Sequence, residues 1–360
     1  MIQSKEVLLH LSLIKGIGPG VVERIIQQLP TDFIVADLYS WSQKEFMRCG
    51  ITSTTAENLV QGLANEKLLE HEQRLLERHG ITIITQKDEQ YPALLKETHL
   101  PPLVLYLKGN PVWMEMPTIA FVGARKANRY GKSAVTALVP ELVHEGWVTV
   151  SGGAYGIDAS VHQTTIECGG KTVVVLGSGL LKPYPLDHVK LFTSVVANGG
   201  ALVSAFPLEL EPLKGNFPAR NRIISGMSKG TVVVQAAQKS GALITAQYAL
   251  EQGRSVFAVP GPIDDPLSKG CNGLLKKGAC LVDDACDILH EFGISADRQS
   301  VLFPVDDAVI DLLSLCKIPR TLDDIVQETG VNEQELTVTL FELQMQGVIE
   351  QNFAGLWQTL

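Results

Sequence analysis

The stretch that decides the fold is Phe121-Val-Gly-Ala-Arg-Lys-Ala-Asn-Arg-Tyr-Gly-Lys-Ser133. An apolar run, Ile119–Val122, meets Gly123 here, and a helical pattern follows. A turn of this kind presents free backbone N–H groups and the positive end of a helix dipole, where an anion can bind. No acid occurs between Glu115 and Glu141, and four cations fall close together: Arg125, Lys126, Arg129 and Lys132. The stretch therefore predicts phosphate contact, with a solvated helix start as the alternative.

The end of this stretch, Gly131-Lys132-Ser133, also resembles the second half of a nucleoside-triphosphate P-loop. That motif has four residues between its glycines, whereas seven residues separate Gly123 from Gly131. The lysine would not lie over the phosphates, so the spacing argues against a P-loop.

Apolar runs followed by glycine and a helical pattern recur throughout residues 117–290. They are Ile119–Val122, Val148–Val150, Val173–Leu176, Ala201–Val203, Val232–Val234 and Val256–Val259. Because these runs lack polar alternation, we expect strands buried on both faces of a parallel sheet, with helices between them. The pattern predicts an α/β fold with a Rossmann-like, doubly wound, mainly parallel sheet, whose ligands bind beyond the carboxyl ends of the strands. In the helix expected over residues 132–144, Pro140 should cause a kink or a break.

The flanking regions predict two further domains. Residues 1–64 contain short helical patterns broken at residues 16–20 and 49–52, and the extended Rossmann-like domain covers residues 65–290, with its core at 117–290. A linker follows at residues 291–304. Residues 305–360 have the order of a winged helix, with a terminal hairpin after three helical stretches near Asp306–Leu315, Thr321–Glu328 and Glu333–Gln346.

The net charge of −9 disfavours a nucleic-acid partner until its distribution is considered. Ten acids and only two cations fall within residues 301–360, so the rest of the chain is close to neutral and can carry local basic patches. The expected third helix of this region bears Glu333, Glu335 and Glu342 and no lysine or arginine. We therefore expect that this helix does not grip DNA; the alternative is binding through Lys317, Arg320 and the wing.

The composition bears on location and redox state. No apolar run approaches the roughly 20 residues that a membrane span needs, so we expect no contact with a membrane. The N-terminus lacks the layout of a signal peptide, which favours the cytoplasm. The six cysteines, at positions 49, 168, 271, 280, 286 and 316, form no C-x-x-C pair. We expect reduced thiols and no metal site.

A second glycine-rich turn follows the run that ends at Val150. Ser151, Gly153 and Gly156 have the spacing of a dinucleotide fingerprint, but serine replaces the first glycine and no acid follows about 20 residues later. We therefore expect neither NAD nor another cofactor. Close approach of the backbone at Ser151, Gly152 and Gly156 to a phosphate remains a prediction.

Two further groups have simple structural explanations. Asp158 and His162 share one face of the expected helix, and a hydrogen-bonded structural role explains His162 more simply than catalysis. Ser240, Gly241 and Thr245 follow the fifth strand, where they could touch a phosphate or cap a helix.

A second cationic segment runs from residue 213 to residue 230 without an acid. Phe217 lies among its four cations, which are Lys214, Arg220, Arg222 and Lys229. Positive charges for phosphates and an aromatic ring for a base are what single-stranded nucleic acid requires. The Arg220-Asn221-Arg222 run could instead satisfy neighbouring carbonyls and carboxylates, so Lys214 and Phe217 are the better candidates for ligand contact.

The motifs taken together resemble one family. Their order is Val-Gly-x-Arg, Ser-Gly-x-Ala-x-Gly-Ile-Asp, Leu-Gly-x-Gly-Leu-x-x-x-Tyr-Pro, Phe-Pro-x-Arg-Asn-Arg-Ile-Ile, Ser-Gly-x-Leu-Ile-Thr-Ala and Val-Pro-Gly. Over roughly residues 85–290 this order is similar to the DNA-processing protein A (DprA/Smf) family. Gly16–Gly20 resembles the hairpin of that family's N-terminal SAM-like or helix-hairpin-helix domain, and the tail resembles its winged-helix-like domain.

The resemblance implies a cytoplasmic bacterial protein, not an enzyme, that acts in natural transformation. Its members bind and protect single-stranded DNA, load the RecA recombinase onto it, and form homodimers through the Rossmann-like domain. Their DNA pocket surrounds residues that match Arg125 and Lys214. The full set of expected DNA contacts is Gly123, Arg125, Lys126, Arg129, Ser151, Gly152, Gly156, Lys214, Phe217, Arg220, Asn221, Arg222, Ser240, Gly241 and Thr245.

Four positions depart from the family's usual pattern. Ala205 and Gln235 replace glutamates, Asn128 replaces a serine, and Val161 replaces an alanine. Because two carboxylates are missing near the strand ends, we expect a more positive pocket.

The main alternative is an enzyme, a nucleotide phosphoribohydrolase with a related fold. Its chemistry needs a positioned carboxylate against the developing sugar cation, yet Ala205 and Gln235 occupy two obvious places for one. The Pro-Gly-Gly-x-Gly-Thr loop of those enzymes is absent. A Rossmann oxidoreductase would need the glycine pattern and the ribose-binding acid that this chain lacks.

Overall fold

The computed structural model describes residues 4–29, 35–294, 312–313, 315–345, 349–352 and 355–359. Two compact units divide the chain, residues 1–295 and residues 296–360. The boundary predicted between residues 64 and 65 lies inside the first unit and stays a prediction.

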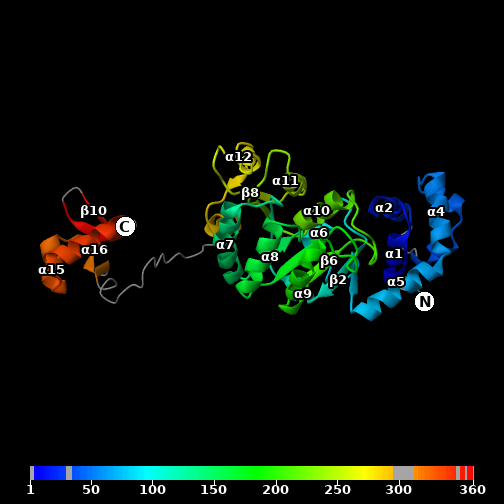
Figure 1. Cartoon of the computed structure of the whole chain (residues 1–360), viewed down its shortest axis with the longest axis horizontal. Coiled ribbons are helices and arrows are strands. Elements are labelled where there is room, and N and C mark those ends of the chain that lie inside the picture. The colour runs from blue at the N-terminus through cyan, green and yellow to red at the C-terminus, as the bar shows by residue number, and fades with distance from the viewer. Residues whose placement is uncertain are drawn as a thin grey trace. The chain divides into compact units, whose positions relative to one another are not determined.

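A nine-stranded sheet forms the centre of the first unit, in the order β1-β2-β6-β5-β4-β3-β7-β8-β9 (Figure 1). Its strands are β1 (Thr82–Thr85), β2 (Val104–Gly109), β3 (Thr118–Val122), β4 (Val148–Ser151), β5 (Thr172–Leu176), β6 (Ala201–Ser204), β7 (Gly230–Val233), β8 (Ser255–Ala258) and β9 (Cys280–Leu281). Neighbouring strands are parallel throughout the part β6-β5-β4-β3-β7-β8-β9 of this order. Strand β1 pairs antiparallel with β2, and β2 pairs antiparallel with β6. The predicted doubly wound, mainly parallel sheet is confirmed.

The strand sequences explain why the centre of the sheet is buried. Every residue of β3, β4, β5, β6 and β7 is buried, as expected for apolar runs without polar alternation. Each of the six runs predicted as strands overlaps one of the observed parallel strands.

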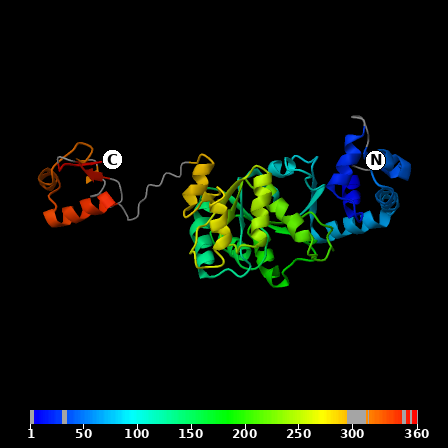
Figure 2. The same ribbon diagram turned by 90° about the horizontal axis from the view of Figure 1, so that it is seen from above.

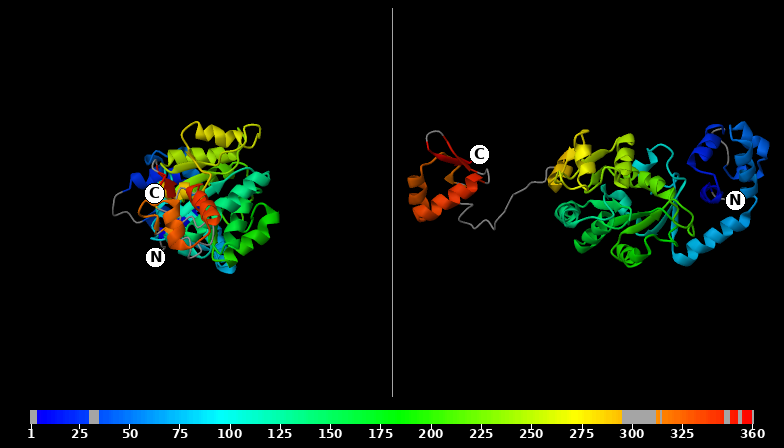
Figure 3. Two further views of the ribbon diagram at one scale, coloured as in Figure 1. Left: turned by 90° about the vertical axis from the view of Figure 1, so that its left-hand side faces the viewer. Right: turned by 45° about the horizontal axis from the view of Figure 1, so that its top comes forward.

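Helices cover both faces of the sheet. On one face lie α7 (Arg129–His144), α8 (Ile157–Glu167) and α9 (Val189–Ala197), and on the other lie α10 (Asn216–Gly226) and α11 (Gly241–Glu251) (Figures 1 and 3). From β3 the chain moves outward through β4 and β5 to β6, and then returns through α10 to β7 on the other side of β3. The strand order therefore reverses between β3 and β7, where ligands bind in doubly wound folds.

Helix α7 continues through Pro140 to His144, so of the two predicted outcomes, a kink or a break, the break is wrong. A proline inside a helix removes one hydrogen bond and costs about 3 kcal/mol. The buried apolar face of α7 offsets this cost, since Val135, Leu138, Val139 and Leu142 are at most 2% exposed.

The predicted short helices at the N-terminus are present. The helices that precede the sheet are α1 (Ser4–Leu13), α2 (Pro19–Gln27), the 3₁₀ helix η1 (Val35–Ser40), α3 (Gln43–Arg48), α4 (Ser53–Leu63) and α5 (Glu66–His79). They lie beside the β1–β2 end of the sheet (Figure 2). Their core is continuous with it, because Val7 and Leu59 belong to the same apolar cluster as Val174 and Leu202.

Several short elements complete the first unit. They are α6 (Ala93–Lys96), η2 (Pro111–Glu115), η3 (Leu186–His188), α12 (Lys269–Leu275) and α13 (Ala285–Glu291).

The second unit contains α15 (Leu322–Thr329), α16 (Glu333–Met345) and the antiparallel hairpin of β10 (Ile349–Gln351) and β11 (Trp357–Thr359). Ile325, Leu336, Leu340 and Trp357 form its core. Most of the predicted linker and most of the helical stretch 306–315 lie outside the described residues. Among the described helices, none has the length and apolar character needed to cross a membrane.

Candidate nucleic-acid interface

A pocket of about 290 Å³ lies at the carboxyl ends of the strands where the strand order reverses. It is lined by Val122, Gly123, Arg125, Ala154, Asp158, Phe217, Pro218, Arg220, Asn221, Ile224, Ser240, Gly241, Ala242, Ile244 and Thr245. The loops after β3, β4 and β7 and the start of α10 thus meet at one place, as the strand–turn–helix pattern predicted. We call this space the switch-point pocket.

Arg125 and Phe217 form the most informative pair in this pocket. The guanidinium carbon of Arg125 lies 5.7 Å from the centre of the Phe217 ring, which places the cation over the ring face. The Arg125 side chain is exposed, whereas Phe217 is half-buried. A charge that can meet a phosphate therefore lies beside a ring that can meet a base.

Lys214 is exposed and lies two residues before the start of α10, while Phe217 lies in the first turn of that helix. Lys214 does not line the switch-point pocket. Along the chain it is three residues before Phe217.

Arg220 has a mainly structural environment. Its Nη1 donates hydrogen bonds to the Gly152 carbonyl and to the Val175 carbonyl, the latter at 2.5 Å, so the guanidinium joins the ends of β4 and β5. Burial lowers the pKa of Arg220 to about 10, although the nearby Asp158 carboxylate opposes the shift. Burial also raises the pKa of Asp158, whose carboxylate accepts a hydrogen bond from the Ala154 N–H.

Arg222 likewise donates to the backbone. Its guanidinium bonds the carbonyls of His99 at 2.9 Å and Leu100 at 2.7 Å, which ties α10 to the loop before β2. Both arginines of the Arg-Asn-Arg run thus satisfy carbonyls, as the structural alternative anticipated. DNA contact by Arg220, Asn221 or Arg222 is not tested by this arrangement.

The glycine-rich turn after β4 is shaped by close backbone approach. Gly156 has a φ of +77°, and a side chain there would collide with the carbonyls of Ala124 and Arg125. The turn therefore packs directly on the loop that presents Arg125. The buried Ser151 hydroxyl donates to the Phe121 carbonyl at 2.7 Å, so it joins β4 to β3 and does not line the pocket.

On the opposite wall, Ser240 is the N-cap of α11 and accepts a hydrogen bond from the Ala242 N–H at 3.3 Å. Capping is the structural use expected for such a residue. Gly241 is exposed and Thr245 is buried, and both line the pocket.

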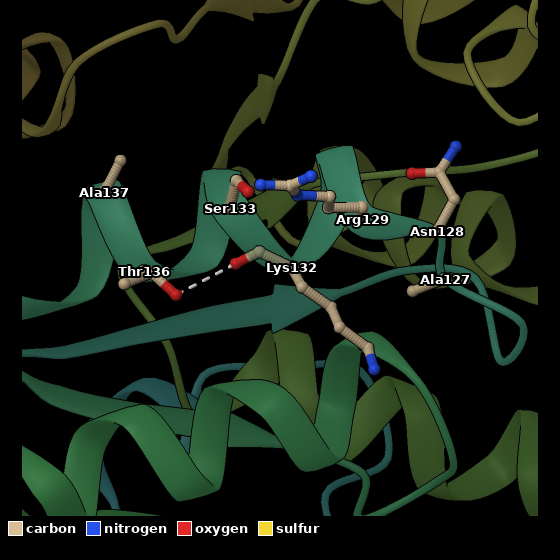
Figure 4. Close-up of a pocket in the computed structure, with 7 residues that line it drawn as sticks. All are labelled: Ala127, Asn128, Arg129, Lys132, Ser133, Thr136 and Ala137. Atoms are coloured by element: carbon tan, nitrogen blue, oxygen red, sulfur yellow. Dashed lines mark hydrogen bonds between the residues drawn. The ribbon is translucent and has the colours of Figure 1, made fainter.

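The remaining predicted cations lie around the start of α7. Lys126, Arg129 and Lys132 are exposed and do not line the switch-point pocket. Arg129 and Lys132 line a separate shallow hollow on α7, where their side chains point in different directions (Figure 4). Lys132 is thus a helix-surface residue, which agrees with the argument against a P-loop.

Gln235 and Asn128, two departures from the family's pattern, contact each other. Gln235 is 1% exposed and donates from Nε2 to Asn128 Oδ1 at 2.7 Å, while its Oε1 accepts from the Asn128 N–H at 3.2 Å. Asn128 Oδ1 also accepts from the Gly131 N–H and so caps α7. Neither Gln235 nor Ala205 lines the switch-point pocket.

His162 is buried and its Nδ1 lies 2.7 Å from the Thr172 hydroxyl. Burial, together with the positive field of Arg220, lowers its pKa to about 3. This environment agrees with the structural interpretation and keeps the ring neutral near pH 7.

Several side chains near the pocket were not among the predicted contacts. Tyr184, in the loop after β5, lies with its ring centre 5.9 Å from that of Phe217. Ile244 lines the pocket one turn after Gly241. The Tyr-Pro pair within the third motif could have drawn attention to Tyr184, but nothing in the sequence placed it beside Phe217.

One possible metal-ligand cluster lies away from the pocket. In the described part of the chain, Glu141, Asp284 and Cys286 bring three ligand atoms within 4.8 Å of one another. The Cys286 thiol donates to Glu141 at 3.3 Å, and Asp284 accepts from the Cys286 N–H at 2.8 Å. The three side chains therefore already cap α13 and join it to α7.

Comparisons with known proteins identify the family of this chain. The family model described as DNA recombination-mediator protein A matches residues 82–293, and a DprA winged helix domain model matches residues 296–352. Protein Smf of Escherichia coli is 38% identical over 288 residues, with 76% of each chain covered. DNA processing protein DprA of Bacillus subtilis is 44% identical over 213 residues, covering 59% of this chain and 71% of the relative.

A solved structure is similar in fold over most of this chain. The X-ray structure of DNA processing protein A from Streptococcus pneumoniae has a TM-score of 0.69 at 30% identity, covering 81% of this chain and 99% of the other. DNA processing protein A from Helicobacter pylori, whose structural report concerns its single-stranded DNA binding mode, has a TM-score of 0.54 at 28% identity. That match covers 59% of this chain and 95% of the other.

Proposed function

The chain belongs to the DNA recombination-mediator protein A family, and from this membership we propose that it binds single-stranded DNA at the switch-point pocket. The Arg125–Phe217 pair carries the proposal, because it offers a cation and an aromatic face at the same point of the fold. The Helicobacter pylori relative, described as binding single-stranded DNA, supports the same ligand. Phosphates would meet Arg125 and Lys214, and a base would meet Phe217.

The wider role follows from the family. We propose that the protein protects incoming strands in natural transformation and loads RecA onto them. This role places it in the cytoplasm of a bacterium. We further propose a homodimer through the Rossmann-like domain, which a mass measurement in solution would test.

A binding function explains the pocket better than catalysis does. Asp158 is the only carboxylate among the described residues that line it, and this group is buried against Arg220 and the Ala154 N–H. A hydrolase would need a carboxylate free to meet the sugar. Release of base from AMP, or a change in NADH fluorescence, would favour the enzymatic alternatives.

The second unit is proposed to bind something other than DNA through α16. Glu333 and Glu335 are exposed on this helix, and so are the apolar side chains of Val338 and Phe341, at 58% and 54%. Arg320, one of the two cations offered for the alternative, is ion-paired with Glu328. An acidic face with apolar side chains suits a protein surface better than a polyanion.

The test is a salt-dependent titration with single- and double-stranded oligonucleotides. Each phosphate contact contributes about 0.7 to the log–log salt slope for single strands, so Arg125→Ala with Lys214→Ala should weaken binding strongly and flatten the slope by roughly 1.4. The matched control is Lys67→Ala with Arg78→Ala, which removes the same charge from the exposed face of α5. Equal affinity and slope in the folded double variant would refute the assignment.

A further inference from the structure

Three aromatic side chains lie beside the switch-point pocket, at the carboxyl ends of β4 and β5. Phe217 begins the row, Tyr184 is in the loop after β5, and Tyr155 is in the loop after β4. The Phe217 and Tyr184 rings are tilted by 59°, with centres 5.9 Å apart, so they contact each other without leaving a slot between them. We call these three residues the aromatic row.

The two tyrosines leave much of their rings in solvent. Tyr184 is 43% exposed and Tyr155 is 41% exposed, although large aromatic residues are usually well buried in a folded domain. Both rings are also next to the switch-point pocket, because Tyr184 contacts Phe217 and Tyr155 follows the pocket-lining Ala154. Their position is therefore continuous with the proposed DNA site.

The surroundings hold Phe217 and Tyr155 in place before any ligand binds. A Cβ on Gly177 would lie 3.0 Å from the Phe217 ring, so the glycine makes room for that ring against the end of β5. The Tyr155 hydroxyl donates to the Asp187 carboxylate at 2.7 Å, and the His188 ring packs edge-on at 4.8 Å. His188 is itself fixed, because its Nδ1 lies 2.9 Å from the Gly153 carbonyl.

The charges near the aromatic row favour binding of a base over binding of a phosphate. Asp187 lies at its far end, and the Lys182 ammonium is paired with Glu211 at 2.8 Å. An unpaired phosphate is not favoured beside these carboxylates, whereas a neutral base can stack on a tyrosine there. The Arg125 cation lies at the other end, over the Phe217 ring, and the exposed Lys214 is three residues before Phe217 in the chain.

We propose that Tyr184 and Tyr155 stack successive nucleobases of a single strand, as second and third positions after Phe217. This inference rests on the proposed function. The DNA strand passes Phe217 and Tyr184 at the end of β5, then Tyr155 at the end of β4, and presents its bases to these rings. Because a ring face accepts any base, the row adds affinity without sequence preference.

The experiment measures binding of oligothymidylates by fluorescence anisotropy, with full-length protein. Tyr184→Ala should weaken binding roughly 5- to 150-fold, the range that corresponds to losing one stacked base. The salt slope should not change, because no charge is removed, whereas Lys214→Ala lowers it by about 0.7. Tyr184→Phe keeps the ring and should bind as the unaltered protein does.

Oligonucleotides with abasic sites give a second, independent measurement. They keep every phosphate, so the unaltered protein should bind them less tightly than the intact strand. This penalty should shrink in Tyr184→Ala, because the ring and the base act as one contact. Tyr155→Ala should show the same pattern only with DNA strands long enough to reach it. Asp187→Asn keeps both rings and should change the affinity less than Tyr155→Ala does.

Misfolding is controlled by Tyr184→Leu, which keeps apolar contact with Phe217 but has no flat ring. If Tyr184→Ala and Tyr184→Leu both retain full affinity and the full abasic penalty while Arg125→Ala with Lys214→Ala loses binding, the row is refuted and the proposed function stands. If the unaltered protein does not bind single strands at all, the proposed function fails and the row fails with it.

Discussion

Exchanging Gln235 for glutamate tests whether the two departures from the family's pattern compensate each other. In Gln235→Glu, a carboxylate oxygen replaces the Nε2 donor 2.7 Å from Asn128 Oδ1, at a site that is 1% exposed. Rotating the Asn128 amide gives no relief. It would set Nδ2 against the Gly131 N–H and Oδ1 against Asp265, which now accepts from Nδ2 at 3.0 Å.

Leaving buried polar groups unsatisfied costs about 1–3 kcal/mol, so Gln235→Glu should lower stability by that amount. Asn128→Ser changes the outcome, because a hydroxyl can donate to the new carboxylate while accepting from the Gly131 N–H as an N-cap. The double variant should therefore be more stable than the sum of the single changes by about 1–2 kcal/mol. The family's usual Ser–Glu pair would thus be restored as a unit.

The assay is thermal or urea unfolding of the two single variants and the double variant at pH 7. Gln247→Glu is the matched control, since exposed Gln247 also donates a side-chain hydrogen bond, to the Glu251 carboxylate at 3.0 Å, but in solvent. The penalty of Gln235→Glu should also shrink at low pH, where a protonated carboxyl can donate as the amide does. An unchanged stability in Gln235→Glu, or strictly additive effects in the double variant, would show that the pair is not coupled.

Three further outcomes are expected. The unfolded chain protonates His162 below pH 6.5, whereas the folded state resists protonation until about pH 3, so acid favours unfolding across this window by about 2 kcal/mol at pH 5. His162→Gln should flatten stability between pH 6.5 and 5; a slope equal to that of the unaltered protein would contradict the assignment. Arg220→Met should destabilise by about 3–5 kcal/mol, because it leaves the Asp158 carboxylate buried without its cation, and adding Asp158→Asn should recover part of this loss in thermal unfolding. A truncation ending near residue 300 should retain single-strand affinity within a few-fold in anisotropy, and a collapse of affinity with the fold intact would make the second unit a DNA-binding domain.

The sheet could be predicted because its signal is local. Runs such as Val173–Leu176 are apolar at every position, which only burial on both faces explains. The antiparallel strand β2 was harder to place, since it pairs with β6, nearly one hundred residues away in sequence. The continuation of α7 through Pro140 depended on packing that propensity alone does not contain.

The candidate site was predictable where the chain order alone brings groups together. Residues after β3, β4 and β7 converge on the switch-point pocket because parallel strands share a carboxyl edge. The partners of Arg220 and Arg222 could not be deduced, because both arginines bond carbonyls contributed by distant segments. Gln235 was expected to affect the charge of the pocket, yet it does not line that pocket and instead supports the N-cap of α7.

Helix α10 is fixed on two sides in the absence of DNA. Arg220 bonds it to the ends of β4 and β5, and Arg222 bonds it to the loop before β2. A ligand that met a loose segment would have to order it and would lose part of its binding free energy to that entropy. Here the residue that carries the ring, Phe217, belongs to an already ordered turn. Calorimetry should therefore find a small heat-capacity change that matches the burial of stacked surface alone, without the larger signature of coupled folding.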